Sequence, residues 1–269
     1  MPNLSALRLD FEYAKRGYAR FAAYPAATYA GVFVNVVFGF MKAFILLALF
    51  NERDAIGGYD ATATLTYTWL TQALATSIWI WGWQEIALRI RSGDIATDLV
   101  RPVHPLRAGL AFDLGRAWYH LIFRGLPPLA VGALAFRLTA PSDLLVWVAF
   151  GVSVALAVTI SYAFRAIYNL SAFWLLDYRG PATLALITAT FFTGFVIPVP
   201  FFPDWLARIA HLTPFPAMLQ IPVDIFVGVR AGPAVVGALA VQLGWALVLL
   251  MVAHGLFALG TRRLVAQGG

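Results

Sequence analysis

Six long apolar runs dominate this sequence of 269 residues, and they constrain its fold more than any other feature. A helix needs about 20 apolar residues to cross a membrane, because its backbone must satisfy its own hydrogen bonds inside the lipid. Only 12% of the residues are charged, whereas soluble domains carry about 25%. The sequence therefore predicts an all-α polytopic membrane protein with one transmembrane domain over residues 1–269. The six spans are expected at 26–50, 61–83, 113–138, 144–176, 182–197 and 234–259.

The distribution of basic residues favours this count, with both termini in the cytoplasm. Cytoplasmic loops of membrane proteins carry an excess of Lys and Arg. In this topology the cytoplasmic segments hold eleven basic residues and the outer loops hold three. Treating 144–176 as two spans would place Arg262 and Arg263 outside and weaken the bias. Arginine makes up seventeen of the nineteen basic residues, which is typical of a GC-rich genome and indicates a bacterial cytoplasmic (inner) membrane.

The first 23 residues predict an amphipathic helix that leads into the first span. Apolar residues recur there at alternating spacings of three and four, which places them on one helix face. These residues are Leu4, Leu7, Phe11, Ala14, Tyr18 and Phe21. Such a helix is expected to lie on the cytoplasmic membrane surface. The alternative is a helical leader that is only docked on the bundle.

The segment 84–107 is a compact charged loop between the second and third spans. Gln84 to Arg91 can extend a helix out of the membrane, and Gly93 breaks it. Asp94 to Val100 can then form a second short helix that Pro102 ends. A short helix held at the membrane face by defined breaks is a candidate docking element. The alternative is a solvated loop whose charges only fix the topology.

The segment 198–233 is rich in proline and yet largely apolar. It holds seven of the fifteen prolines, at Pro198, Pro200, Pro203, Pro214, Pro216, Pro222 and Pro233. Broken backbone at membrane depth persists only where protein buries it, so we expect re-entrant half-helices that close the outer end of the bundle. Asp204 to Leu212 would lie on the outer surface, with Trp205 as an anchor. The alternative is an outer cap without a gating role.

Polar residues inside the spans are costly in lipid and indicate a pathway or a structural bond. The candidates for a substrate pathway are Lys42, Gln72, His120, Arg124 and Arg165. They would face a hydrated groove for an anionic or zwitterionic amphiphile, or pair with acids on a partner subunit. Alternatively, Arg116 and Arg165 extend to the inner headgroups, and Arg124 binds carbonyls freed at Pro127 and Pro128. No Asp or Glu within the spans is expected to neutralise these cations.

A polar stripe on the second span has a helical spacing of four residues. It consists of Thr64, Thr68, Gln72 and Thr76. Such stripes more often bond neighbouring helices than substrate, so this one is expected at a helix or subunit interface.

Two segments resemble those of ATP-binding-cassette (ABC) permeases of the ABC-2 type. SGDIATDLVRP, residues 92–102, is similar to the Ser-Gly-acidic-x-x-x-x-Leu-x-Arg-Pro pattern in the cytoplasmic loop of that family. TGFVIPVPFFPDWLARIAHLTPFPAMLQIPVDIFVG, residues 193–228, is similar to the proline-rich region before the last span in its subgroup of multidrug and uncharacterised export permeases. The two segments occur in the expected order within a six-span pattern.

The resemblance implies the permease of an exporter. We expect it to move a hydrophobic or amphipathic compound, such as a drug, an antibiotic or a lipid-like molecule. Two separate ATPase subunits would dock on cytoplasmic coupling helices, and a second permease subunit, identical or related, would complete the pathway. The leader 1–23 would be the connecting helix. The residues that the resemblance implies for ATPase coupling are Arg91, Gly93, Asp94, Asp98, Arg101 and Pro102.

The chain has no motif for binding ATP itself, so we expect it not to be an enzyme. A P-loop needs G-x-x-x-x-G-K-[ST], and Lys15 and Lys42, its two lysines, follow Ala and Met. ATP and Mg²⁺ are therefore expected on the partner ATPase, and we expect no catalytic residue, no metal site and no nucleic-acid partner here. Two other functions stay open, a secondary transporter or channel without an ATPase and a membrane assembly factor that transports nothing.

Overall fold

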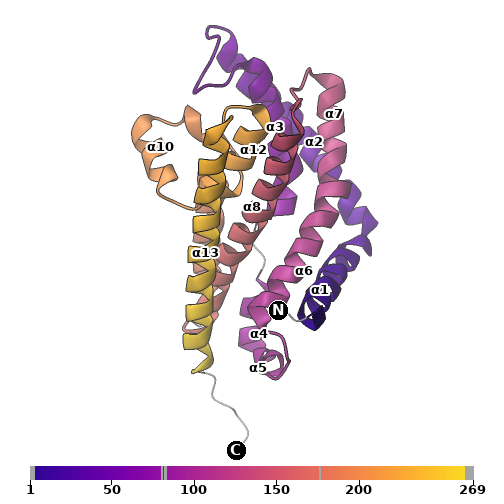
Figure 1. Cartoon of the computed structure of the whole chain (residues 1–269), viewed down its shortest axis with the longest axis vertical. Helices are drawn as coiled ribbons and strands as arrows, with labels where there is room; N and C mark the ends of the chain where they lie inside the picture. The colour runs from indigo at the N-terminus through magenta and orange to yellow at the C-terminus, as the bar shows by residue number, and fades with distance from the viewer. Residues whose placement is uncertain (1–3, 80, 82–83, 176, 264–269) are drawn as a thin grey trace, which may run out of the picture.

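The computed structural model describes residues 4–79, 81, 84–175 and 177–263, and this part of the chain forms a bundle of helices (Figure 1). An antiparallel bridge between Ile56 and Tyr59 is isolated. The α-helices are α1 (Leu4–Ala22), α2 (Pro25–Leu47), α3 (Ala61–Ile78), α4 (Glu85–Ser92), α5 (Ile95–Leu99), α6 (Pro105–His120), α7 (Leu126–Ala135), α8 (Leu144–Leu170), α9 (Arg179–Phe192), α10 (Asp204–His211), α11 (Phe215–Met218), α12 (Gln220–Val227) and α13 (Pro233–Thr261). Short 3-10 turns are η1 (Ala48–Phe50), η3 (Ser171–Phe173) and η4 (Val199–Phe201), and η2 (Leu121–Gly125) is a π-helix.

Three of the described helices are long and apolar enough to cross a membrane. They are Pro25–Phe50, Leu144–Phe173 and Pro233–Thr261, each with a mean hydropathy of 2.3 over its best window. All three fall on predicted runs. Within the run 144–176, α8 is unbroken for 27 residues. Its sequence contains no proline, and Gly151 is its single glycine.

The sequence predicted that a helix would extend from the second apolar run into the charged loop. The structure shows a break in the helix at this point instead. α3 ends at Ile78, and Trp79 takes a left-handed conformation with φ of 54°. In a continued helix the carbonyls of Thr76 and Ser77 would accept bonds from the next turn. Both instead accept bonds from the Arg116 guanidinium, at 2.8 and 2.7 Å. The remaining residues of the predicted span end, 80, 82 and 83, lie outside the described part of the chain.

The third apolar run is part of one long helical path from Pro105 to Ala135, and it is interrupted before the two prolines rather than at them. The N–H of Leu126 bonds the carbonyl of Leu121, five residues back, and so closes the π-turn η2. Pro127 and Pro128 carry no N–H, so the regular ladder cannot resume until after them. A π-turn takes up this mismatch without ending the helix.

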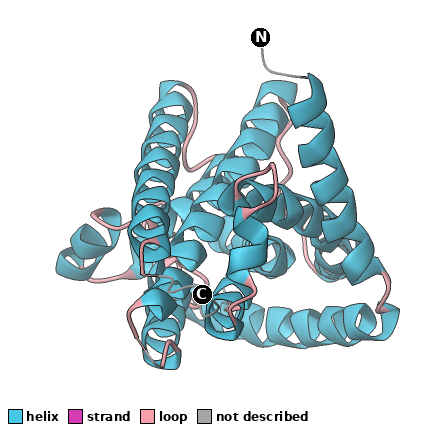
Figure 2. Ribbon diagram, turned by 90° about the horizontal axis from the view of Figure 1, so that it is seen from below, coloured by secondary structure: helices cyan, strands magenta, loops and turns pink. Residues whose placement is uncertain are grey.

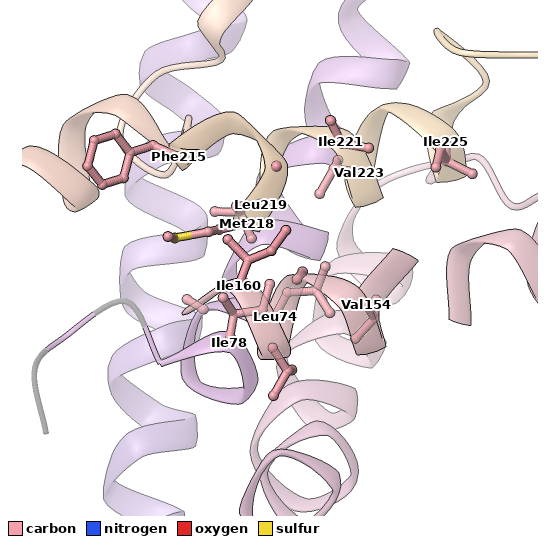
Figure 3. Packing of buried hydrophobic residues seen from close by; sticks show 14 of the residues in the cluster. Leu74, Ile78, Val154, Ile160, Phe215, Met218, Leu219, Ile221, Val223 and Ile225 are labelled. Carbon is pink, nitrogen blue, oxygen red and sulfur yellow. The ribbon is translucent and has the colours of Figure 1, made fainter. Parts of the chain in front are cut away.

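α3 is the central helix, and it is buried on all sides from Thr64 to Ile78. Figure 3 shows its Leu74 and Ile78 close to Ile160 of α8 and to Met218 and Leu219 from the α11–α12 segment. The threonine stripe is therefore inside the chain and not at a subunit surface. Thr68 donates to the carbonyl of Thr64 at 2.8 Å, which bonds the stripe to its own helix.

The proline-rich segment folds into short helices, of which η4, α10 and α11 begin directly after a proline. α11 and α12 are almost entirely buried, whereas Trp205 of α10 is exposed. A buried polar cluster anchors α12. Asp224 accepts hydrogen bonds from the Tyr59 hydroxyl, from Gln220 Nε2 at 2.6 Å and from Arg230 Nε at 3.0 Å. α9 ends at Phe192, before the predicted 197, and Gly194 then takes a φ of 86° close to this cluster.

α1 packs against α6 with its backbone in direct contact, and Figure 2 shows it along its length at the edge of the bundle. A Cβ built on Gly115 would lie 1.8 Å from the carbonyl oxygen of Ala14. A Cβ on Gly17 would lie 2.0 Å from that of Phe112. The ring of Tyr18 meets the ring of Tyr119 edge-on at 5.3 Å. The leader is thus docked on the bundle through a glycine-lined seam.

We predict that Gly115→Ala destabilises the protein by about 1–3 kcal/mol, because the added methyl group meets backbone that cannot move aside. The measurements are heat-induced unfolding in detergent and the rate at which a protease cuts within α1. Gly151→Ala on α8 is the control, since a Cβ there meets no heavy atom within 4 Å. Equal unfolding temperatures for the two variants would contradict the close α1–α6 packing.

Candidate coupling site and buried polar clusters

The charged loop 84–107 forms two short helices, α4 and α5, joined at Gly93. Gly93 has a φ of 81°, a left-handed conformation that favours glycine over any other residue. The Ser92 hydroxyl donates to Asp94 Oδ2 at 2.7 Å and so stabilises the turn. α5 covers Ile95–Leu99, one residue shorter at each end than the predicted helix Asp94 to Val100.

α5 is attached to the bundle by an apolar anchor and by ion pairs. Ile95 is buried in a cluster with Ile90 of α4, Leu106 of α6 and Phe257 of α13. Asp98 accepts from Arg89 Nε at 2.6 Å and lies 3.4 Å from Arg101 Nη1. α5 is therefore held as a rigid part of the bundle end rather than as a mobile loop.

The six residues predicted for coupling lie on this element, and five of them are exposed: Arg91, Gly93, Asp94, Arg101 and Pro102. Asp98 is partly covered by its two arginines. Arg89, the closer partner of Asp98, was not among the predicted residues. Neither were Leu99 and Val100, which are 42% and 86% exposed at the tip of α5. Apolar residues within a charged loop were the signal that could have identified this tip.

His104 caps the first turn of α6, directly after the coupling element. Its Nδ1 accepts a hydrogen bond from the backbone N–H of Leu106 at 3.2 Å, which requires that nitrogen to be unprotonated. Burial, together with the neighbouring His254 ring at 4.9 Å, lowers the pKa of His104 and favours this form. Among the described residues no cluster of three or more His, Cys, Asp and Glu side chains could hold a metal ion.

The cations Arg116 and Arg165 form a buried ion cluster with Asp113, which corrects the expectation that no acid neutralises them. Arg116 Nε donates to Asp113 Oδ1 at 2.7 Å, and Arg165 Nη2 donates to Oδ2 at 2.6 Å. All three side chains are at most 3% exposed. Neither arginine extends to the headgroups. The Trp79 ring covers both guanidinium groups, at 4.2 and 5.6 Å.

Gln72 and Arg124 line a polar seam between α2, α3 and η2. His120 directly precedes η2 and contacts the rings of Phe21 and Trp79. Asn35 of α2 donates to the carbonyl of Gln72 at 3.2 Å. The side-chain atoms Gln72 Nε2, His120 Nδ1 and Arg124 Nε are buried and have no hydrogen-bond partner among the described residues. The guanidinium of Arg124 lies across Gly31, where a Cβ would come within 2.1 Å of Nε.

Lys42 lies apart from this seam, toward the C-terminal end of α2. Its ammonium group donates to the carbonyl of Phe195 and lies 4.5 Å from the centre of the Phe195 ring. The structure therefore divides the five candidates among three environments. Arg165 belongs to the ion cluster, Lys42 binds the segment after α9, and Gln72 and Arg124 line the seam with His120 next to it.

A family model described as "ABC-2 family transporter protein" matches residues 36–268. The chain belongs to the ABC-2 family of transporter permeases. No curated protein and no solved structure matches it. Permeases of this family are non-catalytic membrane subunits of ABC transporters and associate with ABC ATPase subunits. The matched region of the permease includes α4, α5 and the ion cluster, whereas α1 precedes it.

We predict that Asp113→Asn destabilises the permease by about 3–5 kcal/mol, because it leaves two buried guanidinium groups without a counter-charge. The measurements are the unfolding temperature and the yield of monodisperse protein. Asp10→Asn is the matched control, since it removes the same charge from the exposed Arg107–Asp10 pair. Water and salt screen such pairs, so the control should change little. Similar losses in both variants would show that the cluster does not hold the fold.

Proposed function

We propose that the protein is the permease subunit of an ABC exporter that moves a hydrophobic or amphipathic compound out of a bacterial cell. A separate ATPase binds ATP and Mg²⁺ and drives alternating access. The observation that carries the proposal is the rigid α4–α5 element, which has an exposed apolar and basic tip on a membrane chain of this family. Multidrug efflux is the subgroup function that we propose for it.

The arrangement of the elements supports a six-span topology with both termini in the cytoplasm. In Figure 1, α4, α5, the beginning of α1 and the end of α13 lie at the lower end of the bundle. α10, α12 and the beginning of α3 lie toward the upper end. We assign the lower end to the cytoplasm. The candidate spans α2, α8 and α13 are then the first, fourth and sixth spans. α3, the α6–η2–α7 path and α9 are the proposed second, third and fifth spans.

The tip of α5 is the proposed docking surface for the ATPase. ATPase closure shifts the permease between two conformations only if it contacts them differently, so it needs a handle that moves as a unit with the spans. Ile95 and Asp98 provide this link to α4, α6 and α13. The coupling residues of the sequence analysis surround Leu99 and Val100, which would fill an apolar recess on the partner.

The polar seam is the proposed substrate pathway. Buried donors without an acceptor are unfavourable in a folded protein, and they indicate a ligand, water or a partner group. Arg124 and His120 would recruit an anionic or zwitterionic group, and a second permease subunit, identical or related, would complete the pathway. Lys42 is the candidate for the outer exit, where its ammonium group contacts the segment after α9.

We predict that Val100→Glu lowers ATP-driven export and ATPase co-purification about tenfold or more. A tenfold loss of affinity for the ATPase corresponds to ~1.4 kcal/mol of binding free energy at the docking surface. The charge would be buried on docking, although Val100 is exposed in the permease alone. The assay uses vesicles that contain the permease and an ABC ATPase encoded beside it. Leu212→Glu, at an exposed residue after α10, is the control. Full coupling in Val100→Glu would place the docking surface elsewhere.

We predict that Arg124→Ala lowers export while the ATPase still assembles with the permease. The loss arises because the seam no longer offers a cation to the polar group of the compound. Export from vesicles and co-purification of the ATPase are measured on the same preparation. Arg137→Ala, an exposed arginine after α7, removes the same charge outside the seam. Normal export by Arg124→Ala would exclude this arginine from the pathway.

A further inference from the structure

Two apolar grooves flank a ridge that Leu114 and Trp118 form on α6. The first lies between α1 and α6 and includes Phe11 and Lys15 in its lining. The second lies between α6 and α8 and includes Gly151 in its lining. Leu114 and Trp118 border both grooves, and Trp118 is 60% exposed. One ridge thus separates two open apolar grooves.

The first groove has a fixed shape. Its wall is the seam in which the backbones of α1 and α6 touch at Gly17 and Gly115. Because a Cβ at either glycine would clash with backbone oxygen, α1 cannot come closer, and its ring contacts to α6 keep it from moving away. The groove is therefore a built feature of the bundle and not a transient opening.

Lys15 supplies a cation at the edge of the first groove. It is exposed, and no carboxylate lies within ion-pair distance of it in the described part of the chain. Two other basic side chains near the α1–α6 seam, in contrast, do have carboxylate partners. Arg20 pairs with Glu85 at 2.9 Å and Arg107 pairs with Asp10 at 2.6 Å. An anion at the groove would therefore meet Lys15 without displacing an existing partner.

Ser77 adds a polar group to the second groove. Its side chain is buried, and its hydroxyl has no hydrogen-bond partner among the residues that the structure describes. The remaining lining of that groove is apolar, so a ligand there needs hydrocarbon with one oxygen acceptor. The ester group at the head of an acyl chain has this chemistry.

We infer that the two grooves together bind one anionic phospholipid. Its phosphate lies at Lys15, its two acyl chains follow the two sides of the Leu114–Trp118 ridge, and an ester oxygen accepts from Ser77. The indole of Trp118 lies at the depth of the headgroups, where amphipathic rings are favoured. The placement of this lipid in the cytoplasmic leaflet rests on the proposed topology, whereas the site itself rests on the grooves and on Lys15.

The headgroup is tested by titrating the detergent-purified permease, without ATPase, with phosphatidylglycerol or phosphatidylcholine and counting bound lipids by native mass spectrometry. Lys15→Gln should weaken phosphatidylglycerol binding about fivefold, the effect of one basic residue at an anionic surface. It should weaken phosphatidylcholine binding less, because the choline cation of that lipid offsets the charge of its phosphate. Arg16→Gln is the matched control, since Arg16 is exposed on the same helix but does not line the groove. Equal effects of both variants would indicate diffuse attraction and overturn the site.

The acyl chains are tested by filling the second groove. A Cβ at Gly151 meets no heavy atom within 4 Å and Gly151 lines the second groove, so Gly151→Leu should fold and place its side chain in the groove. It should weaken both lipids about tenfold, as expected when roughly two methylene groups lose their contacts. Gly237→Leu, at an equally open glycine of α13, should have no effect. Wild-type binding by Gly151→Leu would overturn the two-chain arrangement.

Two further outcomes would also overturn the inference. A lipid-free dimer that Gly151→Leu dissociates would assign this face to a second copy of the chain, and displacement of the lipid by an exported compound would assign it to substrate. Unfolding temperatures of all variants exclude misfolding. Because the titration uses the permease alone, its failure leaves ATPase coupling intact, and loss of coupling in Val100→Glu leaves the lipid site intact.

Discussion

The desolvation of Arg116, Asp113 and Arg165 is the constraint on which the rest of the structure depends. Charged groups are buried only when partners compensate nearly all of the lost hydration. One carboxylate cannot satisfy two guanidinium groups, so Arg116 also takes the carbonyls of Thr76 and Ser77. This requirement ends α3 at Ile78 and ties α3, α6 and α8 together at one level of the bundle. Trp79 then turns the chain toward α4.

The same cluster connects α8 to the coupling element. Asn169, one turn after Arg165 on α8, accepts from the backbone N–H of Ala87 in α4 at 3.1 Å and donates to the carbonyl of Arg165 at 2.7 Å. α4 in turn carries α5 through Arg89 and Asp98. Force applied to α5 in the proposed exporter therefore reaches α8 through hydrogen bonds and packed side chains rather than through a flexible linker. Contiguous bonded elements of this kind can carry coupling between sites.

The sequence predicted what depends on local pattern and missed what depends on distant partners. The apolar run of α8 and the break at Gly93 follow from neighbouring residues, so both could be located before the structure was known. The pairing of Asp113 with Arg165 joins residues 52 positions apart, and no periodicity reveals it. The end of α3 at Ile78 could not be predicted either, because its cause is the side chain of Arg116 on another helix. The family resemblance was confirmed by the matched region.

Two sets of buried polar groups thus differ in how well they are satisfied, and in the proposed exporter this difference distinguishes a fixed framework from a moving part. Arg116 and Arg165 have oxygen partners, and breaking those bonds would expose charge to a low dielectric. Arg124, His120 and Gln72 keep buried polar atoms without partners among the described residues, at the level where η2 replaces regular helix. π-Turns often occur at functional sites, because the extra residue can shift between hydrogen-bond registers. A rearrangement that leaves the ion cluster intact and repacks η2 against α2 and α3 costs less than one that breaks the cluster. In the proposed exporter, substrate movement is therefore expected along the seam, with the cluster as its fixed support.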